Sequence, residues 1–152
     1  MNTPARAILV LHPDPVLLAS LRAAAEDGER VRAVADWDAL ERALRVAPPG
    51  AVAVVDPCFG QEGGPPSPRL GGILESLRSA QVLAAFPVSG QTVPYVETLV
   101  RWGVADLIDV GREETPGALR HRLAMVHRRM VLRLLERALP RATPSRTRAL
   151  LV

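Results

Sequence analysis

Asp56 has the clearest capacity for chemistry in this sequence, because it directly follows a run of small and branched apolar residues, 51–55. Such a run is typical of a strand buried on both faces, so the aspartate that ends it places a carboxylate at the edge of a sheet. A carboxylate there can hold a cation or accept a phosphoryl group, provided that positive charge offsets the charge on the transferring oxygens. Lysine cannot supply that charge, since all 19 basic residues are arginine.

Other polar residues follow the remaining predicted strands and are expected to share a crevice with Asp56. They are His12, Asp14, Ser89 and Asp109. Two of them also have structural interpretations: Asp14 before Pro15 is typical of a helix cap, and a histidine at a strand end commonly bonds to the backbone. The set of His12, Asp14 and Asp56 lacks the ligand spacing of a metal motif, so we expect no metal site and no cofactor.

No enzyme is predicted, because the sequence offers no nucleophile that can be paired with a base. Cys58 lies two residues past Asp56, and no histidine can be assigned to it as a partner. The first apolar run is followed by His-Pro-Asp-Pro at 12–15 rather than by a glycine-rich phosphate loop. The single cysteine excludes an intramolecular disulfide, and the apolar run that follows the N-terminus is too short for a signal peptide or a membrane span. We therefore expect a cytoplasmic protein without a membrane partner.

Strand-like and helix-like segments alternate along the chain and must position these residues. Strands are predicted at 8–11, 31–35, 51–55, 82–86 and 105–109, and helices at 15–26, 37–46, 69–79, 94–102 and 115–139. Asp14, Ser67 and Thr115 each place a capping oxygen before a proline, which is a helix-start signal. The repeated strand–helix units predict an α/β fold with a doubly wound, five-stranded parallel sheet of flavodoxin-like order 2-1-3-4-5.

The composition is typical of a single domain. With 152 residues, 48% hydrophobic and 23% charged, the chain can bury a core of aliphatic side chains and is not disordered as a whole. We predict one domain at 1–139, which includes the long final helix, and a linker or the truncated start of a following element at 140–152. Residues 57–68, rich in glycine and proline, are predicted to form a long surface loop.

In element order and spacing, residues 6–130 resemble a response-regulator receiver domain, which has the CheY-like form of this fold. The resemblance rests on 8–11 as strand one, on 52–56 as strand three with its aspartate, and on 102–108, which is similar to the family's Gly-Ala turn before its last strand. In that family an acidic pair after strand one holds Mg²⁺ and the strand-three aspartate takes the phosphoryl group. A hydroxyl after strand four contacts that group, and a lysine after strand five neutralises it.

Carried over by position, the resemblance makes Asp56 the phosphoacceptor-like residue, but the other family positions differ. The acidic pair falls on His12 and Pro13, the hydroxyl position falls in 86–89 where Ser89 is the candidate, and the lysine position falls on Val110 beside Asp109. Mg²⁺ prefers octahedral oxygen coordination, so one or two carboxylates make a poor site for it. The expectation is therefore a degenerate receiver, a pseudo-receiver, without the phosphorylation chemistry.

The final predicted helix keeps an apolar stripe for longer than the cover of one sheet face requires. Four residues of this stripe are predicted to form an interface with a second copy of the chain or with another protein: Leu123, Val126, Met130 and Leu134. In the alternative interpretation the extension folds back or frays. The same segment is basic: residues 111–152 carry 10 arginines against 3 acids, whereas residues 1–110 carry 9 against 13.

The layout also resembles the N-terminal regulatory half of a transcription regulator of the AraC-type helix-turn-helix class. A linker at 141–148 and an apolar start at 149–152 follow the long helix, while no recognition helix or base-reading motif is present. We therefore predict a non-catalytic domain for regulation and protein interaction in signal transduction or transcription, controlling an attached or partner DNA-binding domain. It is not expected to bind a specific nucleic-acid sequence itself. The alternatives are a sensor of a small ligand or nucleotide, and an atypical receiver phosphorylated at Asp56.

Overall fold

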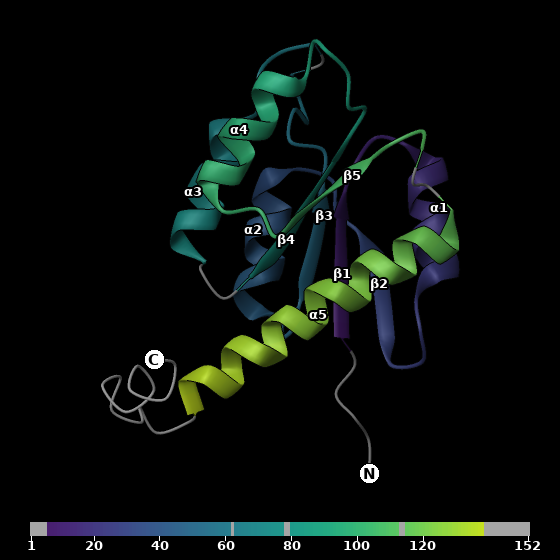
Figure 1. The fold of residues 1–152 in the computed structure, drawn as a ribbon, viewed down its shortest axis with the longest axis vertical. Helices are drawn as coiled ribbons and strands as arrows, with labels where there is room; N and C mark the ends of the chain where they lie inside the picture. Colours follow the sequence, from purple (N-terminus) through teal and green to yellow (C-terminus); the bar gives the residue numbers. More distant parts are fainter. Residues whose placement is uncertain (1–5, 62, 78–79, 113–114, 139–152) are drawn as a thin grey trace, which may run out of the picture.

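Strands and helices alternate without exception in the computed structural model, which describes residues 6–61, 63–77, 80–112 and 115–138 (Figure 1). In chain order the elements are β1 (Arg6–Leu11), α1 (Pro15–Ala24), β2 (Glu29–Ala33), α2 (Trp37–Val46), β3 (Val52–Val55), α3 (Pro68–Ser76), β4 (Gln81–Phe86), α4 (Val93–Trp102), β5 (Asp106–Asp109) and α5 (Pro116–Ala138). Each predicted strand and helix is therefore present in the predicted order.

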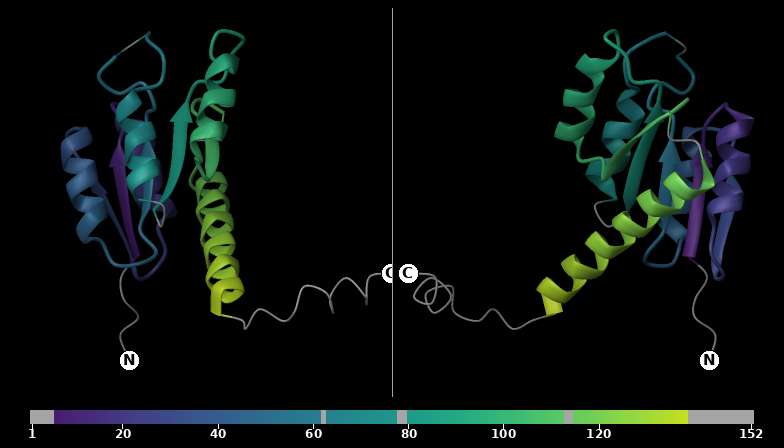
Figure 2. Two further views of the ribbon diagram at one scale, coloured as in Figure 1. Left: turned by 90° about the vertical axis from the view of Figure 1, so that its left-hand side faces the viewer. Right: turned by 45° about the vertical axis from the view of Figure 1, so that its right-hand side comes forward.

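The strands form one five-stranded sheet in the order β2-β1-β3-β4-β5, and each neighbouring pair is parallel. Helices α1 and α5 cover one face of the sheet, and α2, α3 and α4 cover the other (Figures 1 and 2). This is the doubly wound, flavodoxin-like fold that the sequence predicts. All carboxyl ends of the strands meet at one edge because every strand runs in the same direction.

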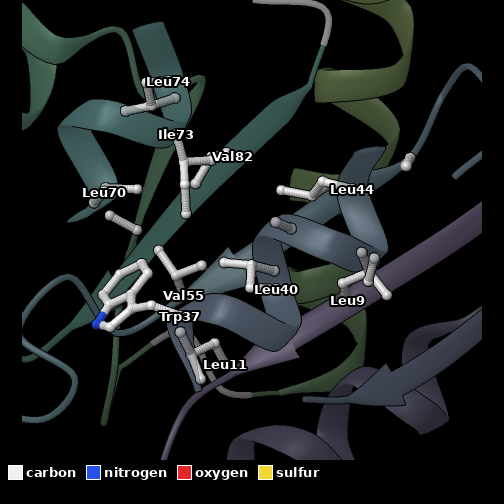
Figure 3. Close-up of a cluster of buried hydrophobic side chains, with 14 of the residues drawn as sticks. Leu9, Leu11, Trp37, Leu40, Leu44, Val55, Leu70, Ile73, Leu74 and Val82 are labelled. Carbon is white, nitrogen blue, oxygen red and sulfur yellow. The ribbon is translucent and has the colours of Figure 1, made fainter. Parts of the chain in front are cut away.

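Successive residues of the strands face opposite helical layers, which gives the molecule two cores. Leu9 and Leu11 pack with the helices α2, α3 and α4, whereas Ile8 and Val10 pack with α1 and α5. Figure 3 shows the first of these cores, in which Trp37 of α2 lies close to other buried apolar side chains. Every residue of β3 and β4 is buried, as expected for strands covered on both sides.

The predicted helix starts are present as hydrogen-bonded caps. The Val16 N–H donates to Asp14 Oδ1 at 2.9 Å, and the Arg69 N–H donates to Ser67 Oγ at 3.2 Å. A further cap was not anticipated: Asp36 begins α2 by accepting the Ala39 N–H at 2.7 Å.

One strand begins earlier than predicted, because its pairing with the neighbouring strand extends beyond its apolar residues. β2 begins at Glu29 rather than at residue 31, because Glu29 pairs with Arg6 in the parallel register with β1. An ion pair of 3.1 Å between Arg6 Nη1 and Glu29 Oε2 supports this register. Residue 139 and the predicted linker at 140–152 lie outside the described residues.

The 23-residue helix α5 has two different halves. Its first half lies on the sheet, and Leu123 and Val126 are only 2% and 0% exposed within this core. The prediction that these two residues form an intermolecular interface is therefore wrong, because they are needed to cover β-strands of their own chain. The second half extends past the sheet (Figure 2), and there Leu132 and Leu135 are 53% and 52% exposed.

The side chains of Met130 and Leu134, the other predicted interface residues, lie outside the described part of the structure. Among the described helices, none is both long and apolar enough to cross a membrane.

Candidate functional site

Asp56 lies where β3 ends, beside the end of β1. Its N–H donates to the Leu11 carbonyl at 2.8 Å, which extends the β1–β3 ladder by one residue. Its carboxylate oxygen Oδ1 accepts the Cys58 N–H at 2.9 Å and closes a tight turn. The partly buried Asp56 therefore lies at the carboxyl edge of the sheet, with its carboxylate held in place by the loop that follows it.

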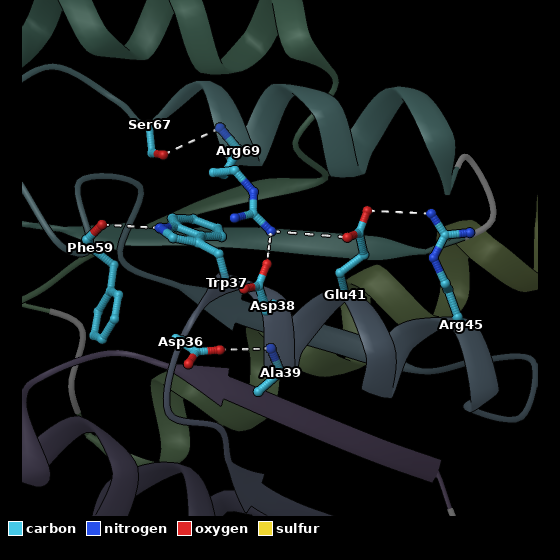
Figure 4. Close-up of polar contacts among 9 residues, drawn as sticks. All are labelled: Asp36, Trp37, Asp38, Ala39, Glu41, Arg45, Phe59, Ser67 and Arg69. Atoms are coloured by element: carbon cyan, nitrogen blue, oxygen red, sulfur yellow. Dashed lines mark hydrogen bonds and ion pairs between the residues drawn. The ribbon is translucent and has the colours of Figure 1, made fainter.

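This loop is anchored on both sides rather than free at the surface. The Trp37 indole donates from Nε1 to the Phe59 carbonyl at 3.0 Å (Figure 4), and the Ser67 N–H donates to the Pro57 carbonyl at 2.7 Å. Because Phe59 also donates its N–H to the Asp56 carbonyl at 3.1 Å, the indole fixes the backbone directly after the aspartate.

Helices α2 and α3, which flank the Asp56 loop, are connected by ion pairs. Arg69 donates to Asp38 and lies 4.0 Å from Glu41 Oε2 (Figure 4). The hydrogen bond from Arg69, with its positive charge, lowers the pKa of Asp38, and the same contact raises the pKa of Arg69. Both side chains are well exposed, so this contact contributes little to stability by itself.

His12 lies across the end of β3, with both ring nitrogens occupied. Its Nδ1 accepts the Asp14 N–H at 3.1 Å, which leaves Nε2 as the protonated nitrogen. Nε2 lies 3.0 Å from the carbonyl of Ala85 in β4, two strands away from β1, and donates to it. A histidine in this arrangement has no free lone pair for a metal ion. His12, which the sequence resemblance places at the family's acidic pair, therefore forms a structural bridge between strands.

Asp14 and Asp109 also use their carboxylates on backbone groups at this edge. Asp14 is the N-cap of α1, as its position before proline predicts. Asp109, at the end of β5, accepts the Val88 N–H at 2.9 Å through Oδ1, and Arg112 Nε lies 3.8 Å from its Oδ2. Arg112 is 85% exposed, so it remains at the rim of the crevice.

Ser89 is exposed in the loop between β4 and α4, where Thr92 organises the polar contacts. The Ser89 N–H donates to Thr92 Oγ1 at 2.8 Å, and this hydroxyl donates to the Pro87 carbonyl at 2.9 Å. Sequence reasoning missed Thr92, although its position three residues after Ser89 is typical of a hydroxyl that closes a turn.

Val110 is the residue that the sequence resemblance places at the family's lysine position. It is partly buried and packs against the core formed by α1, α5 and their face of the sheet. Its N–H donates to the Phe86 carbonyl at 3.1 Å, which continues the pairing of β5 with β4 by one residue. Within the described ranges, Asp56 forms no ion pair, and no group of at least three His, Cys, Asp or Glu residues is suited to a metal ion.

The electrostatic character of the crevice is visible at Cys58. Burial raises the pKa of its thiol, and the negative charge of Asp56 raises this pKa further. The five residues that sequence analysis placed in this crevice all lie at, or shortly after, the carboxyl ends of β1, β3, β4 or β5. The edge thus carries several carboxylates that are held by backbone N–H groups, and among the described residues the exposed Arg112 forms an ion pair with one of them, Asp109.

Solved structures with the same fold are numerous, whereas sequence comparisons find nothing. No family model and no curated protein matches this sequence. A response regulator from Thermotoga maritima superposes with a TM-score of 0.66 at 17% identity, over 81% of this chain and 98% of that one. The REC domain of the response regulator AraT from Geobacillus stearothermophilus gives 0.62 at 20% identity, over 86% and 98%.

A chain described as an adenylate cyclase from Rhodopirellula baltica superposes with a TM-score of 0.69 at 17% identity, over 93% of this chain and all of that one. Together with the sheet order and the aspartate at the end of β3, these similarities define the fold: it is that of response-regulator receiver domains.

Proposed function

We propose that this chain is a pseudo-receiver, a regulatory domain that keeps the receiver fold and acts through protein contacts without phosphorylation chemistry. The observation that carries this proposal is Val110, an apolar side chain packed against the core of α1 and α5 at the position where the resemblance to receivers expects a lysine. A phosphoryl group on Asp56 would then have no fixed positive charge beside it. A phosphoryl group and a carboxylate about 4 Å apart would repel by roughly 4 kcal/mol at an effective dielectric constant of about 20. Among the described residues, the positive group paired with a carboxylate of this crevice is Arg112, which is 85% exposed and already bound to Asp109.

The same residue suggests how the crevice communicates with the rest of the molecule. Val110 packs against the core that contains Leu119 and Leu123 of α5, so a change at the carboxyl edge can alter how this helix packs on the sheet. The mechanism that we infer is a shift between two packings of α5, biased by whatever protein group occupies the Asp56 crevice.

The output surface in this proposal is the projecting end of α5, and its partner is a second copy of the chain. Leu132 and Leu135 are three positions apart, lie on neighbouring parts of the helix surface and are both about half exposed. Two such helices could bury these side chains against each other. In a cytoplasmic transcription regulator, this pairing would set the distance between two attached helix-turn-helix domains.

Phosphorylation of the purified chain tests the chemical part of the proposal. The protein is incubated with acetyl phosphate and Mg²⁺, and its intact mass is measured beside that of the matched variant Asp56→Asn. We expect no phosphoryl adduct in either protein. An adduct that forms readily and requires Asp56 would contradict the proposal and favour an atypical, phosphorylated receiver.

A restored variant supplies the positive arm of this experiment. His12→Asp, Pro13→Asp and Val110→Lys together return the carboxylate pair and the ammonium to the edge that holds Asp56. Circular dichroism verifies that this variant is folded, and we then expect an adduct that is absent when Asp56→Asn is added. If the folded variant stays unmodified, the missing charges are not the reason for the lack of reaction, and the reasoning is wrong.

A further inference from the structure

A cavity of about 550 Å³ lies at the opposite edge of the sheet from Asp56, where β4 and β5 begin. It is bounded by the ends of α3 and α4 and by the middle of α5. Its volume is within the range of about 300–1,000 Å³ that small-molecule sites occupy. The functional crevice described above does not include any of its lining residues.

Gln81, the first residue of β4, brings a polar side chain to this cavity. The residue is only 6% exposed, and the hydrogen bonds of the described residues include none to its side-chain amide. Its neighbour Val82 packs toward α2, α3 and α4, so Gln81 faces the α5 side of the sheet. Among the described residues, Arg6 Nε is the buried side-chain polar atom that lacks a partner, so the amide atoms of Gln81 keep access to solvent in the cavity. A ligand there can replace water as the hydrogen-bond partner of this amide.

Trp102, the last residue of α4, forms an apolar wall of the cavity. Its ring is packed against Gly71 of α3 so closely that a Cβ added there would lie 3.3 Å from Cε2 of the indole. The glycine therefore lets the ring approach the α3 backbone and fixes its position. An indole held in this way offers a flat surface on which a planar ligand can stack.

Two arginines give the cavity a positive character. Arg129 of α5 donates from Nη1 to the Ala105 carbonyl at 2.8 Å, which holds its guanidinium at the cavity. Arg101 of α4 is exposed and, within the described part of the chain, pairs with no carboxylate. Glu75 is the acidic residue of the lining, so the lining residues sum to a charge of +1. Guanidinium groups bind phosphate oxygens through paired, charge-assisted hydrogen bonds.

We infer that this cavity binds a purine mononucleotide. The base would stack on Trp102 and present its edge to the Gln81 amide, a pairing that glutamine makes well with adenine. The phosphate would lie between Arg101 and Arg129. This site is independent of the proposed function: it adds a ligand at the amino edge of β4 and β5, while the pseudo-receiver chemistry concerns the carboxyl edge.

Fluorescence of Trp102 tests the inference directly. The chain has two tryptophans, so Trp37→Phe leaves Trp102 as the only indole. We expect AMP to quench its emission in a saturable manner, and calorimetric titration of the unsubstituted chain to give the same affinity without relying on this variant. Absence of saturable binding in calorimetry overturns the inference.

Substitutions then identify the side chains that bind the nucleotide. The double variant Arg101→Gln/Arg129→Gln should weaken AMP binding by roughly tenfold or more, whereas the control Arg112→Gln at the opposite edge should leave it unchanged. Gln81→Leu should likewise weaken it. Unchanged affinity in the double variant or in Gln81→Leu overturns the assignment.

Binding of the separate parts of the nucleotide distinguishes a nucleotide site from a site for a simpler ligand. Adenosine and inorganic phosphate should each bind more weakly than AMP by roughly tenfold or more, because each lacks one of the two recognised parts. If phosphate alone binds as tightly as AMP, the cavity is a plain anion site and the inference is wrong. If adenosine binds as tightly as AMP, the arginines do not bind the phosphate, and the inference is also wrong.

Discussion

A matched pair of truncations in α5 separates its role in the fold from its proposed role in association. Leu123 is 2% exposed in the core on the sheet, while Leu132, nine residues further along the same helix, is 53% exposed. Both residues are leucines within one helix, so Leu123→Ala and Leu132→Ala change helix propensity equally. Any difference between them therefore reports on the environment of each side chain.

The expected magnitudes follow from these environments. Leu123→Ala removes three buried carbon groups, each contributing about 0.8 kcal/mol of transfer free energy, and the unfilled cavity raises the total to about 2.7–5 kcal/mol. That is a large part of a total stability of about 5–15 kcal/mol. Leu132→Ala should change the free energy of unfolding of the monomer by less than about 0.5 kcal/mol, because the side chain is mostly solvated already.

Urea unfolding followed by circular dichroism measures the first quantity, and sedimentation equilibrium over a range of protein concentrations measures association. We expect Leu123→Ala to lower the urea midpoint strongly, and Leu132→Ala to leave a low-concentration sample unaffected but to weaken dimer formation. Equal losses of stability in the two variants would refute the placement of α5. A chain that stays monomeric at every concentration would refute its pairing with a second copy.

Two further predictions follow from the pKa shifts. The Asp56 charge helps to raise the pKa of the Cys58 thiol, so Asp56→Asn should lower that pKa and speed the alkylation of Cys58 by iodoacetamide at fixed pH. The control Asp109→Asn should leave the alkylation rate unchanged. An unchanged rate in Asp56→Asn would show that the Asp56 charge does not act on the thiol. The contact with Arg69 lowers the pKa of Asp38 in the folded state, so this contact stabilises the fold above about pH 4, and the stabilisation is lost as pH falls through the folded pKa. Arg69→Gln should therefore reduce the fall of the urea midpoint between neutral and acid pH. If the variant and the unsubstituted chain lose stability equally with acid, the Asp38–Arg69 contact does not contribute to this pH dependence.

The fold was largely predictable because local signals and global topology agree. The apolar runs at 52–55 and 82–86 are long enough and pure enough to specify strands covered on both faces, and the caps at Asp14 and Ser67 mark helix starts through contacts within a few residues. Parallel strands with helical crossovers then leave few possible strand orders. The carboxyl-edge position of Asp56 follows from this order alone.

The contacts within the site were not predictable to the same degree. The bond of His12 to Ala85 joins residues 73 positions apart, and the Thr92 hydroxyl became visible only once the loop after β4 had a defined path. Leu123 and Val126 were assigned to an interface because the length of the apolar stripe does not reveal where the sheet beneath it ends.

The sequence by itself determined the order of strands and helices, the place of Asp56 after β3, and the absence of any lysine that could neutralise a charge there. Only the tertiary structure decided what the more distant groups do: His12 bridges two strands, Asp109 holds the Val88 N–H, and Val110 packs against the core of α1 and α5. The reason is physical. Secondary structure follows from periodicity over a few residues, whereas the orientation of a polar side chain depends on which distant backbone groups the folded chain brings within about 3 Å of it.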